Sequence, residues 1–322
     1  MKAVQVKGFG TSDVLEYVDV AVPSVSCSEV LIKQEAIGVN FIDIYQRSGA
    51  YEVKLPFIPG SEGAGVVSGI GKDVTQFKTG DRVAYSMSPG GYAEYVAVSE
   101  SNVVSVPDGI DLSTAAACLL QGMTAHYLVY STFKLQPQQT CLIHAGAGGV
   151  GLVLIQMAKN IGAKVITTVS TEEKKRLALE AGADEVVLYT QDNFVEEVNR
   201  ITKGQGLEVV YDSVGQTTFE GGLDCLKPRG YFVLYGQSSG AVPPIDPQLL
   251  NRKGSIFLTR PTLASYMLNR EELNWRSGDI FRWIEQGMLQ IRIGLSLPLK
   301  NAPRAHDDLA TRKTTGKVIL TP

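Results

Sequence analysis

A glycine-rich segment from residue 144 to residue 151 has the residue types and the spacing that bind a diphosphate. It ends the apolar run Thr140–His144 and opens the apolar run Val150–Ile161, which is typical of a strand, a tight turn and a helix. In the Gly-x-Gly-x-x-Gly fingerprint, the glycines permit the turn, let the backbone approach a pyrophosphate, and let helix and strand pack closely. The helix N-terminus adds unpaired N–H groups and a positive dipole end. A purely structural turn is the alternative. The residues predicted to bind the pyrophosphate are Gly146, Gly148, Gly149, Val150 and Gly151.

The end of the next predicted strand indicates which dinucleotide binds. Sites that select NAD place Asp or Glu there, about 20 residues after the glycines, to bind the ribose 2′-hydroxyl. Here that position holds Ser170, and Lys174 follows one helical turn later. Ser170 carries no charge to repel a 2′-phosphate, and Lys174 can form a charge-assisted hydrogen bond to it, worth roughly 1.5–3 kcal/mol. The sequence therefore predicts NADPH, whereas Lys175 and Arg176 are interpreted as solvated charges.

These residues must be positioned by two kinds of secondary structure. Up to about residue 110, short strands alternate with turns, which predicts a β-rich barrel or sandwich. From about residue 113, where Ser113 is predicted to cap a helix running toward Tyr130, strands alternate with helices as in a doubly wound parallel sheet. Strands are expected at Glu29–Lys33, Gly63–Val67, Asp81–Tyr85, Tyr92–Val96, Thr140–His144, Lys164–Thr168, Glu185–Leu188, Leu207–Asp212, Tyr231–Tyr235, Ser255–Thr259 and Lys317–Leu320. Further helices are expected at Val150–Ile161, Glu172–Ala181, Phe194–Thr202, Phe219–Leu226 and Ile280–Gln286.

Composition narrows the class of protein further. A length of 322 residues corresponds to about two domains of ordinary size, and 44% hydrophobic residues exclude a disordered chain. The 30 basic and 33 acidic residues give a net charge of −3, which argues against nucleic acid as the main partner because duplex binding needs many cationic contacts. No segment predicts a membrane span or an export signal. The four cysteines show no metal-ligand spacing and are interpreted as reduced thiols of a cytoplasmic, metal-free protein.

Short motifs along the whole length of the chain carry a family resemblance. They are Gly38–Asp43, Pro59–Gly65, Gly80–Val83, Leu120–Ala125, Ala145–Gly151, Tyr211–Gly215, Gly236–Gly240, Ala305–Leu309 and Gly316–Val318. Together they resemble the medium-chain dehydrogenase/reductase superfamily, and within it the NADPH:quinone oxidoreductases of the zeta-crystallin-like group. The resemblance implies an α/β fold in two domains, with an active site in the cleft between them. Residues 1–125 and 265–322 would form a GroES-like β-rich catalytic domain, and residues 126–264 a Rossmann domain that binds NADPH.

The same resemblance argues against a zinc site. Zinc alcohol dehydrogenases of the superfamily carry a cysteine where Asn40 stands and a histidine where Ser61 stands. They also insert a four-cysteine lobe near residues 85–95, where this chain has only a short loop. Without these ligands the sequence predicts no metal to stabilise an alkoxide, so alcohol oxidation is not expected.

Site residues carried over from the family fall into a cofactor set and an acceptor set. The cofactor set adds to the glycine segment the residues Asn40, Gln121, Thr124, Ser170, Lys174, Tyr189, Ser213, Tyr235, Ser238 and Lys317, the last toward the nicotinamide half. Tyr45 is the candidate to touch the acceptor, where its phenol could donate a hydrogen bond or a proton. Asn40 would hold the nicotinamide ribose or the acceptor. Simple packing at strand ends or in a pocket wall is the alternative for Tyr45, Asn40 and the residues at strand ends.

Three functions remain open on this evidence. The first is NADPH-dependent reduction of quinones, in which the nicotinamide delivers reducing equivalents to a conjugated acceptor. The second is reduction of the double bond of a 2-alkenal or enone, and the third is NADPH binding without catalysis. The resemblance also implies a homodimer, joined through edge strands of the Rossmann sheet.

Overall fold

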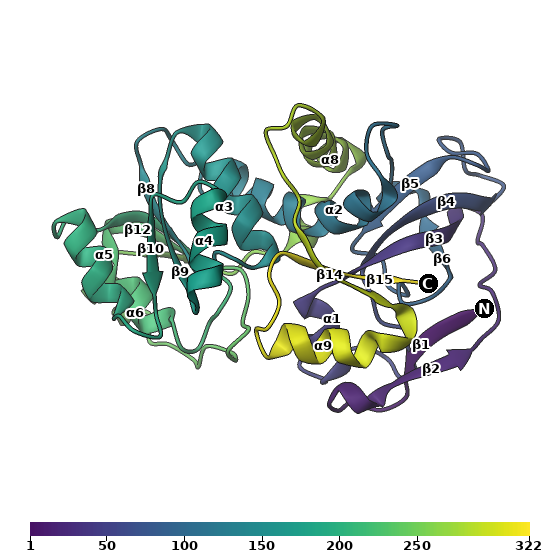
Figure 1. The fold of residues 1–322 in the computed structure, drawn as a ribbon, viewed down its shortest axis with the longest axis horizontal. Helices are drawn as coiled ribbons and strands as arrows, with labels where there is room; N and C mark the ends of the chain where they lie inside the picture. The colour runs from purple at the N-terminus through teal and green to yellow at the C-terminus, as the bar shows by residue number, and fades with distance from the viewer. The chain divides into compact units, whose positions relative to one another are not determined.

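The computed structural model describes residues 1–322 and divides into two units that carry different sheets (Figure 1). The first unit combines both ends of the chain, Met1–Met123 and Tyr266–Pro322. The second is continuous, Thr124–Ser265. Each has its own sheet and its own buried clusters, so each is described by itself.

The second unit holds a six-stranded sheet in which every neighbouring pair is parallel, in the order β10-β9-β8-β11-β12-β13. The chain starts in the middle of this sheet at β8 and winds out to both edges, as predicted for a doubly wound sheet. The strands are β8 (Thr140–Ile143), β9 (Lys164–Val169), β10 (Glu185–Leu188), β11 (Leu207–Asp212), β12 (Leu226–Leu234) and β13 (Phe257–Thr259).

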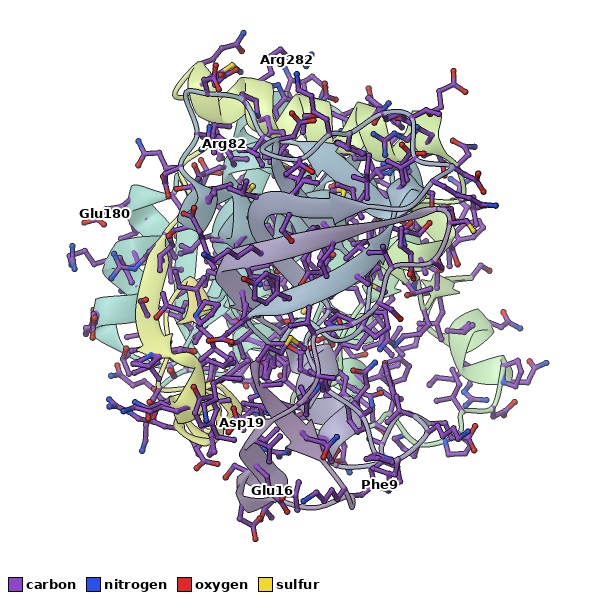
Figure 2. All side chains as sticks on the ribbon, turned by 90° about the vertical axis from the view of Figure 1, so that its right-hand side faces the viewer. Phe9, Glu16, Asp19, Arg82, Glu180 and Arg282 are labelled. Atoms are coloured by element: carbon purple, nitrogen blue, oxygen red, sulfur yellow. The ribbon has the colours of Figure 1, made fainter.

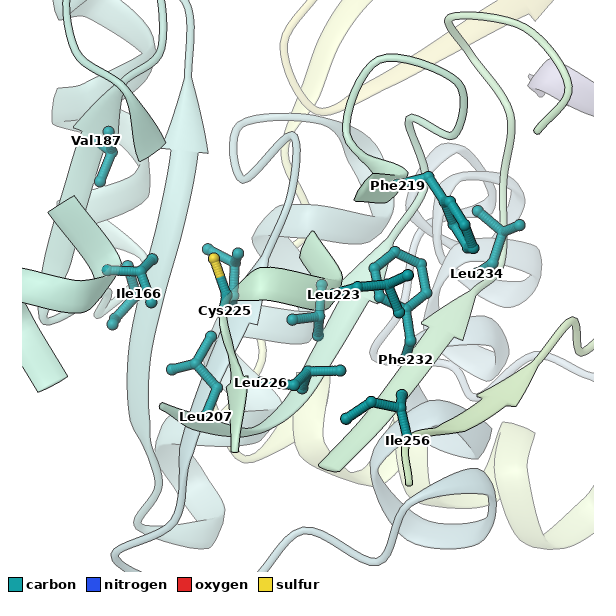
Figure 3. Close-up of a cluster of buried hydrophobic side chains, with 13 residues drawn as sticks. Ile166, Val187, Leu207, Phe219, Leu223, Cys225, Leu226, Phe232, Leu234 and Ile256 are labelled. Atoms are coloured by element: carbon teal, nitrogen blue, oxygen red, sulfur yellow. The ribbon is translucent and has the colours of Figure 1, made fainter. Parts of the chain in front are cut away.

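Helices cover both faces of this sheet (Figure 1). On one face lie α3 (Gly149–Ile161) and α4 (Glu172–Glu180); on the other lie α5 (Phe194–Thr202) and α6 (Phe219–Asp224). A buried cluster joins α6 to the sheet, and in it the rings of Phe219 and Phe232 meet edge to face at 5.1 Å (Figure 3). Burial on both faces explains why several of the strands are apolar over most of their length. A short helix, α7 (Gln248–Arg252), precedes β13.

The first unit is mainly antiparallel. Its larger sheet has the order β14-β15-β3-β4-β5-β7, with β6 also paired to β3, and a separate hairpin joins β1 to β2. Chain ends far apart in sequence meet here because β15 pairs with β3. The strands are β1 (Lys2–Val6), β2 (Leu15–Asp19), β3 (Glu29–Val39), β4 (Glu62–Ile70), β5 (Arg82–Ser86), β6 (Tyr95–Ser99), β7 (Val103–Ser105), β14 (Ile293–Pro298) and β15 (Lys317–Thr321).

Three helices belong wholly to this unit and a fourth begins in it. They are α1 (Phe41–Arg47), α8 (Arg270–Glu285), α9 (Ala302–Ala310) and α2 (Leu112–Tyr127), which runs on into the second unit. Figure 2 shows acidic and basic side chains of this unit pointing outward, among them Glu16, Asp19 and Arg282. Both signs of charge are therefore exposed, in keeping with the near-neutral composition.

Several boundaries differ from the sequence-based expectation, among them those of β3, which runs on to Val39, and of β12, which begins five residues earlier at Leu226. The α2 helix is capped by Asp111 rather than Ser113, because the Asp111 carboxylate accepts the Thr114 N–H at 2.9 Å. The strand expected at Tyr92–Val96 begins later, at Tyr95, because the backbone of Tyr92 bonds instead to Pro59 O at 2.8 Å. The helix expected at Ile280–Gln286 begins ten residues earlier, at Arg270.

No helix is long and apolar enough to cross a membrane. All four cysteines are unpaired, and Cys118, Cys141 and Cys225 are buried.

Candidate active site

The glycine segment forms the predicted turn between β8 and α3. Gly148 is the N-cap of α3 and, having no side chain, gives the helix no side-chain cap. A Cβ on Gly146 would stand 2.1 Å from Thr167 Oγ1, and one on Gly151 would stand 2.3 Å from Ala145 O. The turn therefore tolerates only glycine at these two points, and the N-terminus of α3 presents backbone N–H groups without side-chain acceptors. This cradle fits a pyrophosphate.

The residues predicted to choose the cofactor lie where β9 and β10 end. Ser170 follows β9, and Thr171 caps α4 by accepting the Lys174 N–H at 3.3 Å. Tyr189 follows β10, where its N–H bonds to Val169 O at 3.1 Å and its side chain is exposed. Arg176 is paired with Glu180 at 2.6 Å on the exposed face of α4. Ser170, Lys174 and Tyr189 thus stand at the carboxyl ends of adjacent parallel strands, where ligands of such sheets bind.

A second group of predicted residues lies at the carboxyl ends of β11 and β12. The Ser238 N–H donates to Ser213 O at 3.1 Å, and the Tyr235 N–H donates to Asp212 O at 2.8 Å. Burial raises the pKa of the Tyr235 phenol, which also has a side-chain hydrogen bond to Ser213. Ser213, Tyr235 and Ser238 are therefore brought together at the same edge of the sheet as the glycine turn.

Gln121 and Thr124 lie three residues apart on α2, so they share one helix face. Both side chains are nearly buried. Gln121 belongs to the first unit and Thr124 to the second.

In the first unit, Asn40 and Lys317 come together around a residue that the sequence did not single out, Glu62. The Lys317 ammonium donates to Asn40 Oδ1 at 2.7 Å and to Glu62 Oε2 at 2.6 Å. Asn40 Nδ2 donates to Glu62 Oε2 at 3.1 Å. Lys317 and Glu62 have 0% exposed side chains, so this is a fully buried ion pair. The cluster joins β15, β4 and the start of α1.

The residues at the positions of the family's zinc ligands do not fit a zinc ion. Asn40 offers an amide already bonded to Lys317, and Ser61 offers a hydroxyl that donates to Asp43 Oδ1 at 3.3 Å, whereas zinc in proteins takes thiolate, imidazole or carboxylate. The charge that neutralises Glu62 is the Lys317 ammonium. Nowhere do three or more His, Cys, Asp or Glu side chains gather as they would around a metal ion.

A second buried network lies beside this cluster and centres on Asp43. Tyr92 donates its hydroxyl to Asp43 Oδ2 at 3.0 Å and lies 2.9 Å from His306 Nε2. Since the single Tyr92 proton goes to Asp43, His306 must donate through Nε2, and its Nδ1 can accept from Arg47 Nη1 at 3.5 Å. A neutral His306 agrees with a pKa lowered to about 3 by burial and by Arg47. The network ties α9 to α1, the helix that carries Tyr45.

Burial raises the pKa of Asp43 to about 7, against the opposing hydrogen bonds from Asn40 N, Tyr92 and Ser61. The folded protein therefore holds a proton between about pH 4 and pH 7 that the unfolded chain has released, and this group makes stability fall as pH rises through that window. We expect Asp43→Asn to remove the slope, because an amide keeps the acceptor for Tyr92 and gives Ser61 a donor. Relative to the variant, the wild type should lose about 2–3 kcal/mol between pH 5 and pH 8 in urea unfolding. A difference that is the same at both pH values would contradict this.

Tyr45 lies on α1 within a group of half-buried aromatic rings. Its ring centroid is 6.1 Å from that of Phe41 and 5.2 Å from that of Tyr51. The Tyr51 N–H also bonds to Tyr45 O at 3.0 Å, which folds the segment after α1 back on the helix. Such rings can stack on a flat, conjugated molecule.

The sequence interpretation missed Glu62 and the network of Asp43, Tyr92 and His306. One signal for Glu62 was present, since an ionisable residue stood inside a glycine-rich run that otherwise predicts a buried strand. Its partner Lys317 is 255 residues away, and no spacing rule links the two.

Two family models match the chain. One, described as an alcohol dehydrogenase GroES-like domain, matches residues 26–108. The other, described as a zinc-binding dehydrogenase, matches residues 149–276.

Individual relatives match the full length. A quinone oxidoreductase of Pseudomonas aeruginosa is 45% identical over 100% of this chain and 99% of its own. A 2-haloacrylate reductase of a Burkholderia species is 39% identical over 97% of this chain and 96% of its own. The crystal structure of an Escherichia coli quinone oxidoreductase complexed with NADPH superposes with a TM-score of 0.98, at 40% identity and over 100% of both chains.

Proposed function

This chain belongs to the quinone oxidoreductase family of the medium-chain dehydrogenase/reductases, and from that premise we propose that it reduces quinones with NADPH. The proposed cofactor is supported by the glycine turn at the uncapped N-terminus of α3, which has the shape and polarity of a pyrophosphate site. The choice of quinones as acceptors is supported by the 45% identity, over the full length, to a quinone oxidoreductase.

In this proposal the residues of this chain bind and orient NADPH, the group that supplies the hydride. The N–H groups of α3 hold the pyrophosphate, and Ser170, Lys174 and Tyr189 surround the 2′-phosphate of the adenosine ribose. Ser213, Tyr235 and Ser238 line the carboxyl edge further along the sheet. In the first unit, Asn40 holds the nicotinamide half, with Gln121 and Thr124 of α2 as further contacts.

The decisive measurement is oxidation of NADPH at 340 nm with a panel of quinones, 2-alkenals and 2-haloacrylates. Turnover is expected to be fastest with quinones. Faster turnover of the halogenated acrylates would favour a double-bond reductase, the second candidate, which the identity to a 2-haloacrylate reductase supports. Tight binding of NADPH with no turnover of any acceptor would instead leave the non-catalytic alternative.

Tyr45 is proposed to touch the acceptor because its ring packs with the rings of Phe41 and Tyr51. It lies on α1, whose N-cap residue is Asn40. Replacing Tyr45 by Phe keeps the ring and removes the hydroxyl. We expect kcat with quinones to fall about tenfold or more, in the range of one lost proton donor, with NADPH binding unchanged. Tyr51→Phe is the matched control and should leave kcat within about twofold. Undiminished turnover in Tyr45→Phe would remove its hydroxyl from the mechanism.

A homodimer in the cytoplasm completes the proposal. The strand β13 is an edge of the parallel sheet, and its Phe257 is half exposed and stacked on Tyr231 at 4.6 Å. An exposed edge strand with an apolar residue is suited to pairing with its copy across a two-fold axis. Sedimentation should give the mass of a dimer, and Phe257→Lys should shift it toward the monomer. The unpaired cysteines are those expected in a reducing compartment.

A further inference from the structure

The helix α8 packs on its unit with one face and turns the opposite face to solvent. Its buried residues are Leu273, Arg276, Ser277, Ile280 and Phe281. Because an α-helix has about 3.6 residues per turn, the stripe opposite to these residues holds Glu271, Trp275, Gly278 and Arg282, all of them exposed. Figure 2 shows Arg282 pointing outward. The buried face anchors the helix, so the exposed stripe is presented on a rigid element.

Gly278 lies in the middle of this stripe, and its own chain gives no reason for a glycine there. A helix interior disfavours glycine more than any other residue except proline. Other helix glycines make room for a neighbour: a Cβ on Gly122 of α2 would lie 2.9 Å from Ile280, and one on Gly222 of α6 would lie 2.5 Å from a ring. A Cβ on Gly278 would have no atom within 4 Å. The room at Gly278 is open only to a group from outside the chain.

Large apolar side chains flank this glycine on the same helix. Trp275, one turn before it, is 46% exposed, and the guanidinium carbon of Arg276 lies 4.7 Å from its ring. Leu268 stands just before the helix at 78% exposure, and Met288 stands just after it at 46%. Large apolar groups gathered at the surface of one element indicate an interaction surface.

The stripe is complementary to itself. Its four residues follow one another at intervals of four, three and four, which is the spacing of a seam between two packed helices. A second α8 can lie antiparallel to the first, with a two-fold axis midway between Trp275 and Gly278. Each Trp275 ring then meets the Gly278 of the other copy, and each Glu271 meets the Arg282 of the other copy. A parallel copy would instead set Trp275 against Trp275 and like charges against each other.

We propose that the exposed face of α8 is a contact between two antiparallel copies of this chain, separate from the edge strand β13. The guanidinium of Arg282 has five N–H donors, so its bond to Asp279 leaves donors for the copy's Glu271. Leu268 and Met288 lie beyond opposite ends of the helix, and the same axis brings each of them toward the other in the second copy. This inference does not depend on the use of NADPH or on the acceptor.

The size of the contact sets its strength. A single helix offers far fewer residues than the roughly 20–30 a side of a stable interface. We therefore expect a dissociation constant of about 0.1–1 mM, so that sedimentation at a few micromolar detects only the contact through β13. At higher concentration the mass should rise toward twice its micromolar value.

Gly278→Gln tests the contact between ring and glycine. Sedimentation equilibrium of the full chain over about 5–500 µM is expected to show the rise in mass for the wild type and none for the variant. Because the site is open and glutamine favours a helix, the melting temperature of the variant at the lowest concentration should rise by about 1–3 °C. A variant that still associates, or one that melts lower than the wild type, overturns the proposal.

Charge reversal tests the two-fold arrangement. Glu271→Arg places two arginines at each end of the seam, and Arg282→Glu places two glutamates there. Each variant alone should therefore keep a constant mass up to the highest concentration. An equal mixture pairs an arginine with a glutamate at both ends, so its mass should rise as in the wild type. A mixture that does not associate contradicts the antiparallel contact.

A matched control reverses a charge of the same kind elsewhere. Arg200 of α5 is exposed and paired with Glu197, three residues before it, at 2.8 Å, as Arg282 is paired with Asp279. Arg200→Glu should associate like the wild type, and loss of the rise in mass would trace association to net charge and overturn the proposal. Phe257→Lys should lower the micromolar mass and keep the twofold rise, which separates the two contacts.

Other occupants of this face give different results in the same measurement. A wild type of constant mass that sediments with phosphatidylglycerol vesicles would make the face of α8 a lipid-binding surface and overturn the contact between copies. A constant mass without vesicle binding would overturn it as well.

Discussion

Neutralising one member of the buried pair, through Glu62→Gln or Lys317→Met alone, is expected to lower the free energy of unfolding by about 3–5 kcal/mol. Each single change leaves the opposite charge at a position with 0% exposure and no counter-ion. Desolvation of that charge is then uncompensated. The double variant removes both charges and should recover most of the loss, because well-packed neutral groups replace a buried pair at little cost.

Urea unfolding of the wild type, the two single variants and the double variant measures this as a thermodynamic cycle. The same cycle on Lys227 and Glu208 should give a coupling of about 1 kcal/mol or less, since their side chains are 41% and 20% exposed and solvent screens the pair. Additive single losses at Glu62 and Lys317 would show that the two charges do not depend on each other. A fully stable Lys317→Met variant would show that Glu62 does not need the ammonium.

The parallel sheet was largely predictable because its strands are buried on both faces. Short apolar runs then mark the strands, as with Val209–Tyr211 inside Leu207–Asp212, where expected and observed bounds coincide. The glycine turn was predictable for a related reason, since close approach of backbone to backbone at Gly146 and Gly151 leaves no room for a side chain. Local constraints of this kind leave a trace in the sequence around them.

The first half of α8 was not predicted because its buried face is partly polar, with Arg276 and Ser277 beside Leu273. Arg276 is 1% exposed, donates to Tyr266 O at 2.8 Å and lies 4.7 Å from the ring of Trp275. A buried arginine satisfied in this way interrupts the apolar periodicity that marks a helix face. The apolar periodicity that predicts a helix is present only from Ile280 onward.

The Glu62–Lys317 pair escaped prediction for a different reason. Each residue is the first residue of its strand and the only charged one in it. The sequence alone is therefore equally consistent with an exposed strand end at both positions. Their meeting depends on β15 pairing with β3, which in turn pairs with β4. Contacts made through two steps of sheet topology carry no local spacing signal, so only the assembled sheet reveals them.

Ser170→Asp is expected to reverse the preference for NADPH over NADH. A carboxylate at the end of β9 would face the 2′-phosphate, and two like charges a few ångströms apart near a protein surface repel by about 2–4 kcal/mol. NADPH should therefore bind on the order of 100-fold more weakly. The same carboxylate can accept hydrogen bonds from the ribose hydroxyls of NADH, whose affinity should stay constant or rise.

Lys174→Ala tests the attractive half of the same interaction and should weaken NADPH about 10- to 100-fold with little change for NADH. Arg176→Ala is its matched control on the same helix. It removes one positive charge two residues away, but Arg176 is engaged with Glu180 at 2.6 Å on the exposed face of α4. Fluorescence titration with both cofactors should leave Arg176→Ala within about twofold of the wild type, since an exposed pair contributes little. Equal losses in the Lys174 and Arg176 variants would show that the general charge of α4, rather than one lysine, attracts the 2′-phosphate.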